Sequence, residues 1–187
     1  MTTRIEPLMT IDDLEAMPDD GNRYEVIEGE LFVSRSPGLT HQIVSDNIVV
    51  LIRNFLELQP LGIAVSTPGL ILSQYSGVIP DIVYFSNESR ERVVSGERLT
   101  SAPDLVIEIL SRGNENIRRD RVAKRQLYGK HGVREYWIVD RHLRLVEINS
   151  LQGNSLELTA TLKDGDDVST PVLPGFSCLV TEIFKAF

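Results

Sequence analysis

Cysteine is almost missing from this sequence: Cys178 is the only one among 187 residues. A single thiol excludes a disulfide framework and a cysteine-based zinc site. No apolar run reaches the roughly 20 residues that cross a bilayer, and residues 1–6 carry no apolar signal-peptide segment. We therefore predict a cytoplasmic protein without membrane contact. Walker loops, dinucleotide fingerprints and nucleophile elbows are also absent, so no organic cofactor is predicted.

Basic residues are outnumbered, and both signs of charge are unevenly placed. The sequence has 27 acidic and 19 basic residues, a net charge of −8 and a pI near 4.9. This balance counts against tight non-specific binding to nucleic acid. Residues 1–30 hold nine acids, whereas residues 112–144 hold ten of the bases. The basic segment fits a solvated helix face and a basic surface beside a functional site equally well.

Hydrophobic residues make up 42% of the chain, enough for one domain with its own core. Residue spacing predicts helices at 10–17, 41–58 and 115–130, a hairpin at 23–33, strands near 62–73, 80–85, 104–110, 135–139, 144–148 and 156–162, and a C-terminal tail docked as a helix. We predict a single α/β domain, 1–187, whose mixed sheet is flanked by helices and extended by antiparallel strands. It divides into an N-terminal helix and hairpin at 1–35, a core at about 40–140, and C-terminal strands and tail at 141–187.

Two carboxylates stand in apolar strand sequence. Asp81 opens the run Asp81-Ile82-Val83-Tyr84-Phe85, and Glu108 lies inside Leu105-Val106-Ile107-Glu108-Ile109-Leu110. Both runs are apolar on both side-chain parities, which is typical of strands covered on two faces. An unpaired buried carboxylate costs several kcal/mol. Two of them on neighbouring strands therefore indicate a shared compensating cation.

A lysine on the following helix completes this set. At 100° per residue, Lys124 and Asp120 share one face of the helix with Ala123 and Leu127, and that face turns towards the sheet. The arginines 118, 119 and 125 fall outside it. Lys124 and Asp120 are also four residues apart, so they are close enough to pair. A solvent-exposed salt bridge is the alternative interpretation of this pair.

These residue types suit metal-dependent hydrolysis of phosphodiesters. Two carboxylates hold a hard divalent ion through oxygen. Such an ion activates water and offsets charge on phosphorus. A nearby lysine orients the attacking group and stabilises the pentavalent state. We predict that Asp81 and Glu108 bind the metal and that Lys124 completes the catalytic set.

The ordered motifs also resemble a known group. Pro80-Asp81 followed by Glu108-Ile109-Leu110 resembles the PD-(D/E)XK nuclease superfamily, with Leu110 at the usual lysine position. The whole chain looks more closely like the Uma-two group of restriction-endonuclease-like proteins. The matching segments are Tyr24-Glu25-Val26-Ile27-Glu28-Gly29-Glu30, His41, Pro80-Asp81, Pro103 through Ser111, Asp120 through Tyr128, Gly132-Val133-Arg134-Glu135-Tyr136-Trp137-Ile138-Val139-Asp140 and Pro174-Gly175-Phe176.

The resemblance implies a restriction-endonuclease-like fold, dependence on Mg²⁺ or Mn²⁺, and DNA as substrate. It also implies that the lysine has moved to the following helix, at Lys124. Among the bases of that helix, Arg118, Arg121 and Arg125 are our candidates for contact with the DNA backbone. Because cutting both strands of a duplex often uses two active sites, we also expect a homodimer.

Several residues keep two interpretations. His41 is either a polar contact at a helix start or a catalytic residue, and Glu25 either belongs to the hairpin or assists the metal. Asp120 is a candidate partner of Lys124, whereas Tyr128, Trp137 and Cys178 are assigned to the core. Two other functions stay open for the whole chain: a non-catalytic DNA-binding protein that retains the nuclease fold, and a homodimeric interaction protein.

Overall fold

A mixed six-stranded sheet forms the centre of the protein, in the order β12-β11-β10-β9-β6-β3. In this computed structural model, which describes residues 7–111 and 113–185, β9 and β10 are parallel and the other neighbours in the sheet are antiparallel. The strands are β3 (Gly62–Ser66), β6 (Ile82–Ser86), β9 (Leu105–Ile109), β10 (Glu135–Asp140), β11 (Leu145–Gln152) and β12 (Ser155–Lys163). The parallel pair requires a long crossover, and helical segments between β9 and β10 provide it.

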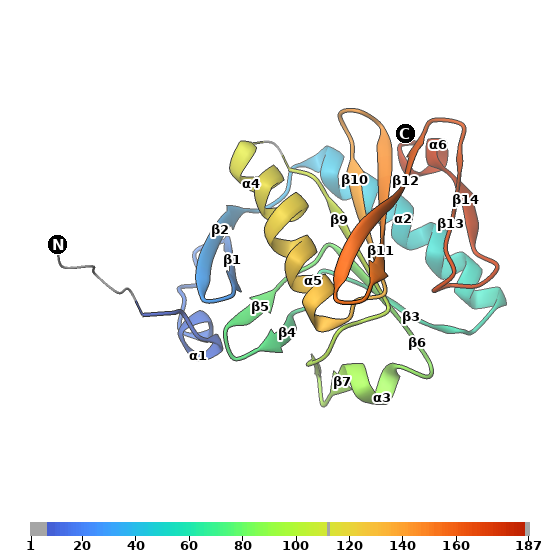
Figure 1. Cartoon of the computed structure of the whole chain (residues 1–187). Helices are drawn as coiled ribbons and strands as arrows, with labels where there is room; N and C mark the ends of the chain where they lie inside the picture. Colours follow the sequence, from blue (N-terminus) through green and yellow to red (C-terminus); the bar gives the residue numbers. More distant parts are fainter. Residues whose placement is uncertain (1–6, 112, 186–187) are drawn as a thin grey trace.

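Helices cover this sheet on both faces (Figure 1). One face packs on α2 (Leu39–Leu58) and the C-terminal tail, in a core that contains Ile52, Ile107 and Trp137. The opposite face packs on α5 (Arg125–His131), whose Leu127 and Tyr128 contact that side. Burial on both faces explains why β9 and β10 are buried at every position. The predicted α/β fold with a mixed, helix-flanked sheet is confirmed.

A second six-stranded sheet runs in the order β2-β1-β5-β4-β8-β7. Its strands are β1 (Asn22–Ile27), β2 (Glu30–Arg35), β4 (Leu70–Ser73), β5 (Ser76–Val78), β7 (Val94–Ser95) and β8 (Arg98–Leu99), and two short helices, α1 (Ile11–Glu15) and α3 (Arg90–Val93), accompany it. The predicted hairpin is confirmed: Glu28 and Gly29 have φ of 52° and 84°, as a tight hairpin turn requires. Thr10 caps α1 through a capping box with Asp13.

Two predicted elements are wrong in their extent. The strand predicted at 62–73 is two strands in different sheets, because the chain turns at Thr67, whose φ is 48°. The helix predicted at 115–130 is α4 (Asn114–Arg118), a π-helical turn (Arg119–Lys124) and α5. An i→i+5 hydrogen-bond pattern replaces the α-helical one in the middle. The helical phase used for the sequence prediction is therefore lost there.

The C-terminal tail docks through a short helix, as predicted, but a strand precedes that helix. It contains the β13–β14 hairpin (Asp167–Ser169 and Ser177–Leu179) and one short helix, α6 (Val180–Ile183). Phe176 joins the core beneath α2 and stacks edge-on against Phe55 at 5.7 Å between ring centres. Across the described ranges, no helix has both the length and the apolar character to cross a membrane.

Candidate active site

The two strand carboxylates meet across neighbouring strands. Because β6 and β9 pair antiparallel with Ile82 opposite Ile107, Asp81 and Glu108 lie beside each other at one end of the sheet. The Ile109 N–H donates a 2.8 Å hydrogen bond to Asp81 Oδ2. Asp81 is 4% exposed and Glu108 3% exposed. The structure thus brings together the two acids that the sequence separates by 27 positions.

Lys124 reaches both Glu108 and a third carboxylate. Its Nζ lies 2.8 Å from Glu108 Oε1 and 2.8 Å from Glu25 Oε1, and the residue is 1% exposed. Tyr128 stands one helical turn further and donates its hydroxyl proton to the same Glu108 oxygen at 2.9 Å. Tyr128 therefore does more than fill the core, because its hydroxyl fixes one lone pair of Glu108. All three predicted site residues, Asp81, Glu108 and Lys124, belong to one buried cluster.

Glu25 is the residue that sequence reasoning undervalued. It sits on β1, which pairs with β5, and the Ile79 N–H donates to its Oε1 at 2.8 Å. It is 3% exposed. Its sequence, Tyr24-Glu25-Val26-Ile27, has the same signal as Glu108: a carboxylate inside apolar strand sequence. Glu25 therefore belongs to the site for the same reason as Glu108, because its buried carboxylate needs a compensating cation.

The π-helical turn changes which bases face the site. Arg119, predicted to lie outside the inner face, is buried, and its Nε binds Asp120 Oδ1 at 2.8 Å. Its Nη1 lies 3.6 Å from Glu25 Oε2. The direct contacts of Asp120 go to Arg119 and those of Lys124 to Glu25 and Glu108, although the charge of Lys124 still lowers the pKa of Asp120. Tyr136 donates its hydroxyl to the Asp120 carbonyl at 3.0 Å, which anchors this turn on β10.

His41 approaches the site from the first turn of α2. Its Nε2 lies 3.1 Å from Asp81 Oδ2, and the residue is 3% exposed. Its Nδ1 is buried without a hydrogen-bond partner among the described residues. Arg23 reaches the other oxygen of Asp81, with Nη1 to Oδ1 at 3.6 Å. Asp81 is thus held by an imidazole, a guanidinium and a backbone N–H.

Burial and neighbouring charges set different pKa values for the carboxylates. Burial raises the pKa of Glu108 to about 8, and the attraction of Lys124 offsets only part of this effect. Burial also acts on Glu25, but Lys124 and Arg119 outweigh it and lower the pKa of Glu25. Burial acts on Asp81 as well, but the hydrogen bond and charge of His41, the Ile109 N–H and the charge of Lys124 together outweigh it and lower the pKa of Asp81.

Burial and neighbouring charges also set the pKa of Lys124. Burial works against its charge, yet Glu108 and Glu25 outweigh burial and raise the pKa of Lys124 above its ordinary value. Lys124 is therefore an ammonium ion at neutral pH. It serves as a source of positive charge and of hydrogen bonds, and cannot accept a proton.

With all four of its carboxylates ionised, which requires a pH above the raised pKa of Glu108, the cluster carries an excess of negative charge. Its four carboxylates are Glu25, Asp81, Glu108 and Asp120, and its three permanent cations are Arg23, Arg119 and Lys124, which leaves a formal net charge of −1. Within the described residues, no group of three or more His, Cys, Asp or Glu side chains is arranged to hold a metal ion. A Mg²⁺ site commonly uses one or two carboxylates and several waters, and the neighbouring carboxylates of Asp81 and Glu108 are oxygen donors of that kind. The residues present fit such an ion.

These side chains line a cavity of about 660 Å³. Its walls come from the end of β2, the start of α2, the segment after β9 and the turn between β10 and β11, which all lie along the upper part of Figure 1. The lining residues that carry charge are Arg23, Glu25, Arg35, His41, Asp81, Glu108, Arg119, Lys124 and Arg141. The buried acids therefore have an opening through which a ligand can reach them.

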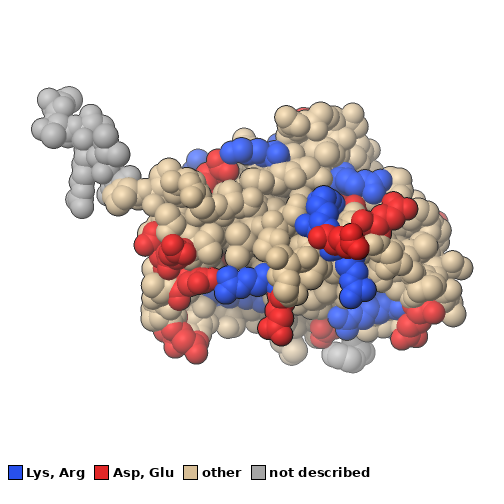
Figure 2. Space-filling model, turned by 90° about the horizontal axis from the view of Figure 1, so that it is seen from below, with Lys and Arg blue, Asp and Glu red and all other residues tan. Residues whose placement is uncertain are grey.

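The arginines predicted to contact DNA lie in different surroundings. Arg118 is exposed and Arg125 is partly exposed, whereas Arg121 is engaged with Glu147 and lies 3.6 Å from Asp140. Arg121 is thus already neutralised within the protein. Figure 2 shows the molecule from below, away from the upper part that holds the cavity walls, and acidic and basic side chains are interspersed on that face. That face does not present a continuous basic surface.

One family model and two solved structures are similar to this chain. The Uma2 family model, described as "Putative restriction endonuclease", matches residues 11–181. A crystal structure of "a putative nuclease belonging to DUF820" from Anabaena variabilis superposes with a TM-score of 0.77 at 20% identity, covering 94% of this chain and 97% of that one. The type IIG restriction endonuclease BpuSI gives a TM-score of 0.41 at 15% identity, covering 77% of this chain and 15% of that one. The search of curated proteins found no match. The first structure establishes the predicted nuclease-type fold.

Proposed function

The chain belongs to the Uma2 family, and we propose that it is a metal-dependent endonuclease that hydrolyses phosphodiester bonds in DNA. The observation that carries the proposal is the convergence of Asp81, Glu108 and Lys124 at the base of one cavity. Three residues with the chemistry of phosphodiester hydrolysis come from a strand entrance, a strand and a π-helical turn.

In this proposal Asp81 and Glu108 hold Mg²⁺ or Mn²⁺. The bound ion supplies Lewis-acid stabilisation of the charge that develops on the phosphate. Once Glu108 is ionised, the formal −1 charge of the cluster favours a cation, and the His41 and Arg23 contacts fix the orientation of Asp81. Glu108 takes no part in these two contacts. Its carboxylate accepts hydrogen bonds from Lys124 and Tyr128 instead.

Lys124 acts as an ammonium ion throughout. Its raised pKa favours the ammonium form, so its contribution is to orient the attacking water and to donate hydrogen bonds to phosphate oxygen. Glu25 keeps Lys124 in place, because it binds the ammonium independently of Glu108. Glu25 is therefore a positioning residue, itself fixed by the Ile79 N–H.

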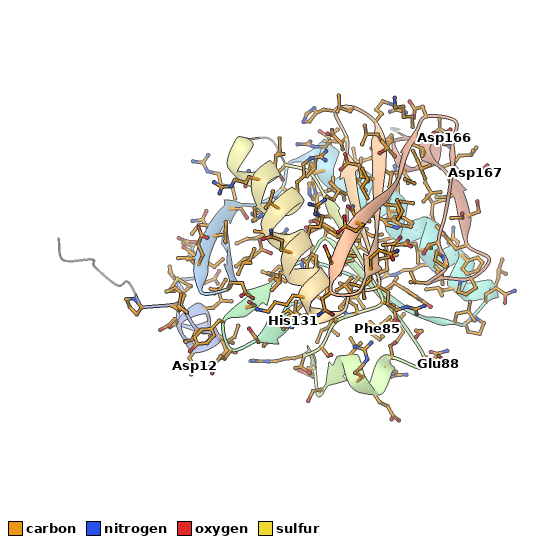
Figure 3. The ribbon with its side chains drawn as sticks, in the orientation of Figure 1. Asp12, Phe85, Glu88, His131, Asp166 and Asp167 are labelled. Carbon is orange, nitrogen blue, oxygen red and sulfur yellow. The ribbon has the colours of Figure 1, made fainter. Side chains whose placement is uncertain are left out.

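The test is nicking of supercoiled DNA by the purified chain with Mg²⁺ or Mn²⁺, beside Glu108→Ala. The matched control is Glu88→Ala, which removes an exposed carboxylate beside α3, at the bottom of Figure 3. We expect nicking by the native chain and by Glu88→Ala, and none by Glu108→Ala. Equal nicking by all three proteins would identify a contaminating nuclease and count against the proposal.

Two non-catalytic alternatives are separated by the same protein samples. A DNA-binding protein without catalysis would shift labelled DNA but leave it intact at every metal concentration. A homodimeric interaction protein would sediment as a dimer and would not bind DNA. The homodimer itself remains a prediction, and sedimentation equilibrium of the native chain decides it.

A further inference from the structure

The long helix α2 begins on the wall of the cavity without a side-chain cap. Its N-cap residue is Gly38, which lines the cavity and has no side chain that could accept a hydrogen bond. The His41 and Gln42 N–H groups both bond the Gly38 carbonyl. The Leu39 and Thr40 N–H groups have no acceptor among the described residues. Because unpaired N–H groups and the helix dipole make this end of a 20-residue helix positive, it favours an anion.

His41, in the first turn of the same helix, adds a second unpaired group. The residue lines the cavity and is 3% exposed. Its Nε2 lies 3.1 Å from Asp81 Oδ2, and its Nδ1 is buried without a partner among the described residues. A buried polar atom without a hydrogen bond is unfavourable, and a ligand that brings its own water can satisfy it. Two independent features of the helix start therefore indicate that a ligand binds there.

Positive charge surrounds the start of α2. Arg35 is exposed at the end of β2, three residues before Gly38, and Arg141 begins the turn after β10. Both line the cavity, and neither has a carboxylate within ion-pair distance in the described part of the chain. The Arg141 Nε donates to the Leu110 carbonyl at 3.2 Å, which leaves other N–H donors of its guanidinium for an anion. The charge at this wall is therefore available to a ligand.

Building on the proposed function, we infer that the start of α2 binds a phosphate group of the DNA backbone, next to the phosphate that reacts. The free N–H groups of the first turn bind its oxygens, and Arg35 and Arg141 supply the compensating charge. The bound phosphate neighbours the reacting one because His41 joins this helix start to the proposed metal ligand Asp81. Such a contact positions the backbone and reads no base, so it serves paired and unpaired strands alike.

Gly38→Asp is the variant that separates phosphate binding from folding. Gly38 has φ of −77° and ψ of 166°, and a Cβ added there meets nothing within 4 Å, so an aspartate fits without strain. An aspartate at an N-cap accepts hydrogen bonds from the first-turn N–H groups and favours the helix. Its carboxylate would occupy the place of the phosphate. The matched variant without a carboxylate is Gly38→Ala, and circular dichroism verifies that each variant is folded.

Inorganic phosphate is the first probe, titrated into the ¹⁵N-labelled chain in a chelating buffer. We expect the amide resonances of Leu39 and Thr40 to shift with saturation in the native chain and in Gly38→Ala, and to stay unchanged in Gly38→Asp. Arg35→Gln should weaken this binding roughly tenfold, as for the loss of one charged hydrogen-bond partner. Shifts that avoid these two amides, or that persist in Gly38→Asp, would overturn the inference.

Duplex DNA distinguishes a backbone phosphate from free phosphate. Fluorescence anisotropy of a labelled duplex, over a range of salt concentrations without divalent metal, should show roughly tenfold weaker binding by Gly38→Asp. Arg35→Gln should reduce the slope of log affinity against log salt by about 0.9, as for one lost phosphate contact. The control Arg90→Gln, at the exposed first residue of α3, should retain the native slope. Native duplex affinity in Gly38→Asp would refute the assignment to DNA, even if inorganic phosphate binds.

Nicking of supercoiled DNA separates this inference from the proposed function. Nicking by Gly38→Asp at the native rate and with native DNA affinity would refute the phosphate site and leave the nuclease activity standing. Native DNA binding that depends on Gly38 and Arg35 as expected, but without nicking in Mg²⁺ or Mn²⁺, would refute the activity and retain the phosphate site.

Discussion

Replacement of Lys124 by methionine is the sharpest test of the buried cluster. The variant keeps the length of the side chain but removes an ammonium that is 1% exposed and 2.8 Å from both Glu25 and Glu108. Removing one partner of a buried ion pair costs about 3–5 kcal/mol, because it leaves uncompensated charge. The exposed pair Arg98–Glu15, with side chains 61% and 52% exposed, gives the control variant Arg98→Met, for which the expected cost is about 0–1 kcal/mol.

The pH dependence of this loss follows from the sign of the carboxyl shift. Burial already raises the pKa of Glu108 to about 8 with Lys124 in place, and removing the ammonium raises it further. A carboxyl whose pKa is higher in the folded than in the unfolded chain binds more protons when folded, so stability falls as pH rises. The deficit of Lys124→Met should therefore be larger at pH 8 than at pH 5.

Urea unfolding followed by circular dichroism at both pH values measures this deficit. A loss at pH 8 no larger than that of Arg98→Met would show that Lys124 does not hold two buried carboxylates. A deficit that grows towards pH 5 would refute the assigned sign. The variant should also lack nuclease activity even under conditions in which it is fully folded.

Three further predictions concern other parts of the molecule. Burial raises the pKa of the Cys178 thiol to about 12, so a thiol reagent at pH 8 should not react with the native protein within the time that suffices for the urea-unfolded chain; equal rates would contradict its burial. Gly129→Ala places a methyl 3.0 Å from the backbone of β12 and should cost about 1–3 kcal/mol in urea unfolding, whereas Gly69→Ala meets open space and should change stability by less than about 0.5 kcal/mol. Asp81→Asn should abolish Mn²⁺ binding measured by calorimetry. The control Asp104→Asn should retain Mn²⁺ binding, because Asp104 accepts hydrogen bonds from Ser86 and Ser89 away from the cavity. Mn²⁺ binding by Asp81→Asn would show that Asp81 is not a metal ligand.

Much of the fold could be predicted because the residues that are apolar at regular spacing in the sequence are also the ones that are buried in the structure. The turn at Glu28-Gly29, the long helix α2 and the doubly covered strand β9 each show a strong pattern within a few residues. The second sheet could not be predicted in this way. Its strands β7 and β8 have two residues each, and β4 pairs with β8 across nearly thirty positions. Such pairing depends on contacts distant in sequence, which residue periodicity does not record.

The candidate site could likewise be predicted only in part. A carboxylate in apolar strand sequence is visible without a structure, because burying an unpaired charge is costly; this identified Asp81 and Glu108 and applies equally to Glu25. The positions of Arg119 and Asp120 were not predictable, since they depend on a π-helical turn. That turn is held by tertiary contacts: the Tyr136 hydroxyl binds the Asp120 carbonyl, and Arg119 lies between Asp120 and Glu25.

The π-helical turn therefore follows from the site rather than from local propensity. An α-helix with 100° per residue directs either Lys124 or Arg119 inward, since five residues span 500° and leave the two side chains 140° apart. The cluster uses both, because Lys124 alone cannot compensate Glu25, Glu108 and Asp120. An i→i+5 turn brings residues five apart onto one side and so buries both cations. Arg119→Ala should consequently return this segment towards α-helical geometry and remove the guanidinium that donates to Asp120, a change that amide hydrogen exchange across 119–124 can detect.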